Sequence, residues 1–227
     1  MGLPLYLALT AAEFTACSPI PPHCAWMACH FSPYGTGLCN LPPVLSGEAM
    51  LILNDRIPPA GHDPQYILDQ LAQINCGCIL LDFQREGNPE SERIVRTIVE
   101  SESRPVGVTP QYIQPLTCPV FLPPVPIDIP LAKYLAPWQG REIWLEAALD
   151  GMCYTITEQG SVSGSLPRIP DRGLRDDDLF CHYQIETFET KAEFSLWRTR
   201  EDLDDLLNKA QSLGVTKAVG LWQELGR

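Results

Sequence analysis

The sequence predicts a mixed α/β fold: a compact, irregular (β/α)8 barrel of the TIM type, with some helices shortened or replaced by loops and a β-hairpin. Short apolar runs alternate with amphipathic helical segments, which is typical of parallel βαβ units. Eight such runs occur in 227 residues, and eight parallel strands close a barrel near the lower end of its usual length. An open doubly wound sheet is the alternative, but no glycine-rich phosphate loop follows the first strand. We expect the strands near residues 3–9, 23–31, 49–54, 77–84, 105–108, 119–123, 180–185 and 217–222.

Three helices have clear start signals. Each begins at a residue whose side chain can cap a helix, and the first two have proline at the first helical position. An apolar stripe with helical spacing follows each cap. Gly214 suits the end of the third helix. The capping positions are Asp63-Pro64, Asn88-Pro89 and Thr199.

Residues 141–162 depart from the alternation of strands and helices. Glu142–Leu149 and Met152–Thr157 are strand-like and flank Asp150-Gly151, a pair typical of two-residue hairpin turns. Residues 161–178 are rich in serine, glycine, proline and charge, and are expected to form a loop. We therefore expect one domain over residues 1–227 that contains a hairpin insertion.

The charge of the chain limits its partners. A formal net charge of −12 argues against nucleic acid or an anionic membrane as the main partner. No stretch approaches the roughly 20 apolar residues of a membrane span. The apolar segment 2–12 could be a signal peptide, but no basic residue precedes it and Glu13 interrupts it, so a buried first strand is expected. The sequence does not predict the oligomeric state.

Nine cysteines are present, and their spacing does not match a zinc ribbon or a redox pair. Several lie within apolar stretches, where cysteine acts as a small buried hydrophobe. We expect mostly free thiols and a cytoplasmic location, with metal ligation as the minor alternative. No cofactor and no metal is expected.

The segment Gly77–Glu86 is the best candidate for a site. It is an apolar strand that ends in alternating polar residues, so Asp82, Gln84 and Glu86 are expected to share one face with Leu80. Polar groups on the core side of a buried strand are costly unless they are hydrogen-bonded or functional. The alternative is structural, with these carboxylates paired to arginines or to backbone donors.

This segment resembles the fourth-strand motif of the family 18 glycoside hydrolases, the chitinase-like barrels. The motif is Asp-x-Asp-x-Glu, and the matching positions are Asp82, Gln84 and Glu86. Residues 210–225 are similar to the final helix and strand of the family, where Trp222 matches a tryptophan of the substrate-pocket floor. The resemblance implies a hydrolase for an N-acetylated sugar polymer.

By this resemblance Glu86 would be the general acid, and Asp82 would set the electrostatics deeper in the barrel. The acetamido group of the substrate would attack the anomeric carbon. Three features depart from the family. Gln84 replaces the middle aspartate, no Ser-x-Gly-Gly stretch lies on an earlier strand, and no Tyr-Asp pair follows residues 120–122.

Other residues are candidates for contacts with a carbohydrate ligand. Asp55 and Arg56 end a neighbouring strand, and Tyr183 and Gln184 lie on a late strand. Trp222 could serve as a sugar platform. The alternative function is a catalytically inactive barrel that serves as a carbohydrate-binding or interaction module, because Gln84 cannot neutralise an oxazolinium ion.

Overall fold

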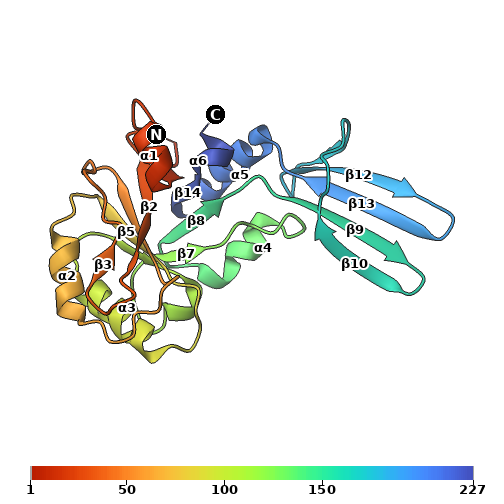
Figure 1. The fold of residues 1–227 in the computed structure, drawn as a ribbon. Helices are drawn as coiled ribbons and strands as arrows, with labels where there is room; N and C mark the ends of the chain where they lie inside the picture. Colours follow the sequence, from red (N-terminus) through yellow and green to blue (C-terminus); the bar gives the residue numbers. More distant parts are fainter. Residues whose placement is uncertain (1, 227) are drawn as a thin grey trace. The chain divides into compact units, whose positions relative to one another are not determined.

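The computed structural model describes residues 2–226, and the contacts of the chain form two compact units. The barrel unit consists of residues 4–123, 140–146 and 215–227. The sheet unit consists mainly of residues 124–139 and 147–214. Figure 1 shows the elements of both units. The prediction that the chain behaves as one domain stays a prediction.

The barrel unit is a closed barrel of eight parallel strands, which confirms the predicted fold class. β1 pairs with both β2 and β14, and this pairing closes the ring. A short strand, β3 (Leu38–Cys39), pairs antiparallel with β2. In order around the ring the strands are β1 (Leu5–Leu9), β2 (Cys24–Phe31), β4 (Met50–Asn54), β5 (Cys78–Asp82), β6 (Val106–Val108), β7 (Val120–Leu122), β8 (Ile143–Ala147) and β14 (Val215–Leu221).

The helices of the barrel unit are few and short, as predicted. The side chains of Asp63 and Asn88 cap α2 (Pro64–Ala72) and α3 (Pro89–Ser101), and each accepts a hydrogen bond from a backbone N–H. Thr10 and Glu13 form a reciprocal capping box at the start of α1. The remaining elements are α1 (Ala11–Ala16), the 3-10 turn η1 (Pro110–Tyr112) and α6 (Trp222–Leu225).

Alternate residues of the strands fill the barrel interior with apolar side chains. Trp144 of β8 is fully buried there and is the largest of them. It lies against Gly107 of β6, where an added Cβ would be 2.3 Å from the indole ring. The missing side chain at Gly107 therefore makes the space that Trp144 occupies.

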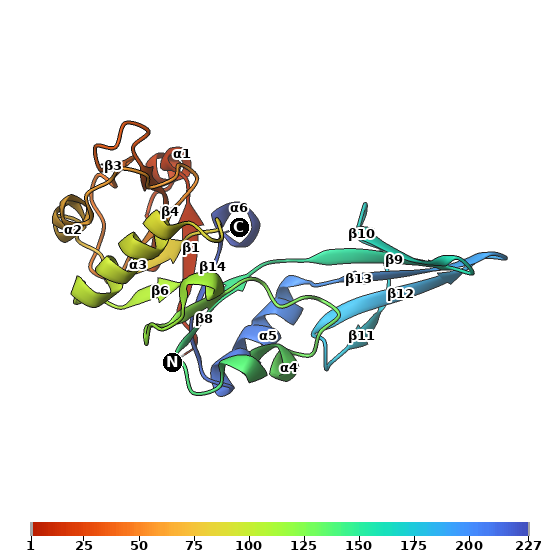
Figure 2. The same cartoon turned by 90° about the horizontal axis from the view of Figure 1, so that it is seen from below.

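The sheet unit contains an antiparallel sheet of five strands in the order β10-β9-β13-β12-β11. Figures 1 and 2 show β9, β13 and β12 side by side as long strands. The strands are β9 (Gly151–Thr157), β10 (Gly160–Ser165), β11 (Leu174–Asp176), β12 (Cys181–Thr187) and β13 (Lys191–Trp197). The helical elements of this unit are α4 (Leu131–Leu135), the 3-10 turn η2 (Ala136–Trp138) and α5 (Arg200–Ser212).

The predicted seventh barrel strand was placed in the wrong segment. β8 takes that position in parallel with β7, whereas residues 180–185 contribute to β12 of the antiparallel sheet. Ile143, Trp144 and Leu145 are all buried, as expected for a strand covered on both faces. The polar alternation of β12 instead suits a sheet with one face in water.

The predicted hairpin around Asp150-Gly151 is also wrong. β8 and β9 do not pair with each other; β9 pairs with β10 and β13, and its hairpin turn lies between Thr157 and Gly160. The expected loop at residues 161–178 therefore contains most of β10 and all of β11.

Candidate functional site

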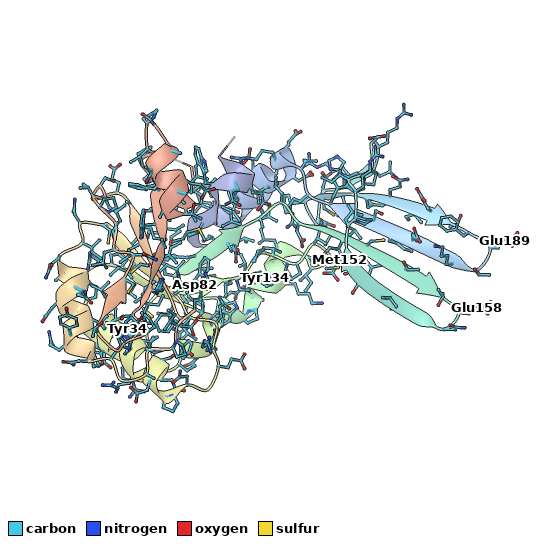
Figure 3. The ribbon with its side chains drawn as sticks, in the orientation of Figure 1. Tyr34, Asp82, Tyr134, Met152, Glu158 and Glu189 are labelled. Carbon is cyan, nitrogen blue, oxygen red and sulfur yellow. The ribbon has the colours of Figure 1, made fainter. Side chains whose placement is uncertain are left out.

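The barrel unit contains a cavity of about 720 Å³ at the carboxyl ends of its strands. Asn54 is the last residue of β4, and Asp82 is the last residue of β5; both line the cavity. Figure 3 labels Asp82 among the side chains of the barrel unit. The carboxyl ends of the strands are where barrel enzymes place their active sites. The apolar part of the lining includes Ala8, Met27, Ile52, Leu80, Phe121 and Val219.

The alternation of side chains along the strands brings the polar groups together. Asn54, Asp82 and Glu146 line the cavity, and each lies two residues beyond a strand residue of the interior cluster. Residues two apart in a strand point to the same side. The three polar side chains therefore form a layer above the apolar interior residues Ile52, Leu80 and Trp144.

Asp55 connects the segment that follows β4 to the segment that follows β5 by hydrogen bonds. It is 3% exposed, and its two carboxylate oxygens accept hydrogen bonds from the backbone N–H groups of Gln84, at 2.9 Å, and Arg85, at 3.0 Å. The guanidinium of Arg85 donates back to the carbonyl oxygens of Asp55 and Arg56. This arrangement holds Gln84 at the cavity rim.

Asp82 is a half-buried carboxyl with a raised pKa. Burial is the main cause, because it disfavours the charged form. A hydrogen bond from the side-chain amide of Gln84 lowers the pKa, and the negative charge of Asp55 raises it further. The amide of Gln84 is thus held against the carboxyl of Asp82.

Glu146 is a cavity residue that the sequence analysis missed. Burial raises its pKa, and the negative charges of Asp82 and Glu224 raise it further. The residue lay in the segment that was interpreted as a hairpin. The available signal was a buried apolar run followed by one carboxyl, the same pattern that drew attention to Asp82.

The structure brings four of the predicted site residues to one cavity: Asp55, Arg56, Asp82 and Gln84. Glu86 is exposed in the turn after β5, and it is not one of the lining residues. β5 ends at Asp82, so the expected strand face does not extend to Glu86.

The other predicted contacts lie elsewhere. Trp222 is half-buried at the start of α6, directly after the lining residue Leu221. Tyr183 and Gln184 belong to β12 of the sheet unit. Their role in ligand binding stays a prediction, as does that of Trp222.

Across residues 2–226, no cluster of three or more histidine, cysteine, aspartate or glutamate side chains has a geometry that could hold a metal ion. Within the same range, no helix is both long and apolar enough to cross a membrane.

Comparison with solved structures finds barrels of the same architecture. The spore cortex-lytic enzyme SleL of Bacillus cereus is 11% identical with a TM-score of 0.57, over 96% of this chain and 70% of that chain. The C-terminal domain of a putative chitinase from Desulfitobacterium hafniense DCB-2 is 11% identical with a TM-score of 0.56, over 98% and 94%. A chitinase from Chromobacterium violaceum ATCC 12472 is 6% identical with a TM-score of 0.51, over 96% and 93%.

At these identities the likeness shows the fold, which is a barrel like those of chitinases. The sequence matches no protein-family model and no curated protein. Membership of glycoside hydrolase family 18 therefore stays a prediction that rests on the residues of β5 and the turn after it, and on the similarity of residues 210–225.

Proposed function

We propose that the barrel unit is a glycoside hydrolase that binds an N-acetylated sugar polymer in its cavity. The observation that carries the proposal is the cavity itself, which contains Asp82, Gln84 and Glu146 at the carboxyl ends of the strands. Its volume of about 720 Å³ is typical of sites for small ligands. The likeness to barrels described as chitinases supports the choice of substrate class.

The cavity combines the groups that an N-acetylated sugar requires. The apolar side chains of Met27 and Phe121 offer surface to the apolar face of a sugar ring. The amide of Gln84 can hydrogen-bond the acetamido group. The raised pKa values of Asp82 and Glu146 favour a protonated carboxyl, which is what a general acid needs.

The resemblance assigns the general acid to Glu86, and this assignment stays a prediction. A general acid must come within about 3 Å of the glycosidic oxygen. For Glu86 this requires the turn after β5 to bring an exposed carboxyl to the bound sugar.

A binding module is the second candidate function. Two observations favour it: Gln84 replaces the middle aspartate of the motif, and Glu86 lies outside the cavity lining. Such a module would bind the sugar polymer in the same cavity and would not cleave it.

Hydrolysis of N-acetylglucosamine hexamers by the full chain tests the proposal, with calorimetry to measure binding of the same oligomers. We expect both binding and cleavage. If Glu86 is the acid, Glu86→Gln reduces cleavage at least about 100-fold. Glu100→Gln, an exposed glutamate at the end of α3, is the matched control and leaves cleavage unchanged. Binding without cleavage favours the module, and the absence of both contradicts the proposal.

A further inference from the structure

The two glutamates at the ends of β8 are held in different ways. Glu142 lies just before the strand and accepts hydrogen bonds from the indole of Trp144 at 2.9 Å and the hydroxyl of Thr216 at 2.8 Å, with the ammonium of Lys217 at 3.5 Å. Burial raises the pKa of Glu142, but these partners outweigh it and lower the pKa overall. Glu142 is therefore an ionised, structural group at the amino end of the strand.

Glu146 lies near the carboxyl end of the same strand. It differs from Glu142 in its hydrogen bonding and in the direction of its pKa shift. It lines the cavity, and among the described residues its carboxyl makes no hydrogen bond and no ion pair. Its side chain lies on the same side of β8 as Trp144, whose indole fills the interior below. A carboxyl without a protein partner, in a cavity of this size, is free to bond a ligand.

Two negatively charged groups near Glu146 raise the pKa of its carboxyl. Asp82 of β5 and Glu224 of α6 act on it as negative charges. The other charged side chains of the cavity are Asp55, Arg56 and Arg85. Of these, Arg85 is engaged with the carbonyl oxygens of the segment after β4, and Asp55 with two backbone N–H groups.

Asp82 is less suited than Glu146 to donate a proton. The amide of Gln84 donates a hydrogen bond to its carboxylate, and this bond stabilises the charged form. Asp82 is thus the carboxyl held by Gln84, and Glu146 is the cavity carboxyl without a protein partner among residues 2–226.

We infer that Glu146 of β8 is the proton donor of the cavity and that Asp82 is its carboxyl neighbour on β5; this inference rests on the proposed hydrolase function. The proton of Glu146 passes to the bridging oxygen as the bond from that oxygen to the anomeric carbon breaks. The bond pair stays on the oxygen, which leaves as a hydroxyl, while the acetamido oxygen of the substrate bonds to the anomeric carbon. Water then adds to that carbon as the bond from the carbon to the acetamido oxygen breaks, which restores the acetamido group, and the water returns a proton to Glu146.

The test uses two substrates that differ in their need for an acid. N-acetylglucosamine oligomers have a poor leaving group, whereas the dinitrophenolate of a 2,4-dinitrophenyl chitobioside leaves without protonation. We expect Glu146→Gln to lose at least about 100-fold in kcat/KM on the oligomers and little on the dinitrophenyl substrate. The control Glu100→Gln should match the wild type on both substrates. Circular dichroism checks that each variant is folded.

The pH profile supplies a second readout. Removal of the charge in Asp82→Asn should lower the pKa of Glu146, so the alkaline limb of kcat/KM moves to lower pH. An active Glu146→Gln variant, or a leaving-group-dependent loss in Glu86→Gln, overturns the inference while the hydrolase function stands. A wild type that cleaves neither substrate overturns both.

Discussion

At the scale of single residues, a buried carboxylate organises the cavity rim. Asp55 presents both oxygens to backbone N–H groups of the segment after β5, and it has almost no contact with water. An acceptor in this position cannot be replaced by a donor without a penalty, because the buried N–H groups would lose their partners.

We expect Asp55→Asn to destabilise the protein by about 1–3 kcal/mol, because the new amide turns an N–H donor towards a backbone N–H. Denaturant unfolding measures this loss. Asp178→Asn changes an exposed aspartate in the same way and should cost less than about 0.5 kcal/mol. Equal stability of Asp55→Asn and the wild type would contradict a stabilising role for the two hydrogen bonds that Asp55 accepts.

At the scale of elements, the start of α5 depends on one fully buried carboxylate. Asp202 accepts hydrogen bonds from the backbone N–H and hydroxyl of Thr199, at 2.9 and 2.7 Å, and has the Nδ1 atom of His182 at 2.8 Å. Its other oxygen lies 3.4 Å from the guanidinium of Arg175. One side chain thus joins α5 to two strands of its own sheet, β11 and β12.

The contacts of Asp202 predict that the stability of the protein depends on pH. Burial raises the pKa of Asp202, but the hydrogen bonds from Thr199 and the contact with His182 outweigh it, so the pKa is lowered overall. A lowered pKa stabilises the fold above the unfolded-state value of about 3.9, and the gain is lost as the pH falls through the folded-state value. The melting temperature of Asp202→Asn should therefore lie below that of the wild type at pH 7, and the difference should shrink below about pH 4. A constant difference from pH 7 to pH 2 would contradict this.

At the scale of the whole molecule, local sequence patterns predicted the helix starts and most of the strand positions. The caps at Asp63, Asn88 and Thr199 are confirmed because a helix start is decided by the few residues that surround it. Seven of the eight strand positions follow from apolar runs, and alternation placed Asp82 correctly on the inner side of β5.

The same patterns did not predict which strands pair with each other or where β5 ends. Whether residues 143–147 pair with β7 or with β9 depends on partners far along the chain, and the Asp150-Gly151 turn signal pointed the wrong way. Glu146 was missed with its strand. Glu86 was placed on the strand face because sequence alternation does not reveal that β5 ends at Asp82.

The nine thiols allow the two units to be followed separately. All nine cysteines are free, as the sequence predicted, and five are buried. Burial raises the pKa of Cys29 to about 12 and of Cys78 to about 11 in the barrel unit, and of Cys181 to about 11 in the sheet unit. A buried thiol with a raised pKa has little reactive thiolate. These three cysteines should therefore react only after the unit that contains them has opened.

We expect the native protein to react slowly at these three positions and faster at the half-buried Cys17 and Cys39. Complete denaturation without reductant should expose nine thiols. If the chain is one cooperative domain, as predicted, then Cys181 and the barrel thiols lose protection at the same denaturant concentration. Labelling with iodoacetamide across a denaturant series, read by peptide mass spectrometry, measures this. Loss of protection at Cys181 well before Cys29 and Cys78 would show that the sheet unit opens alone, and the single-domain prediction would then be wrong.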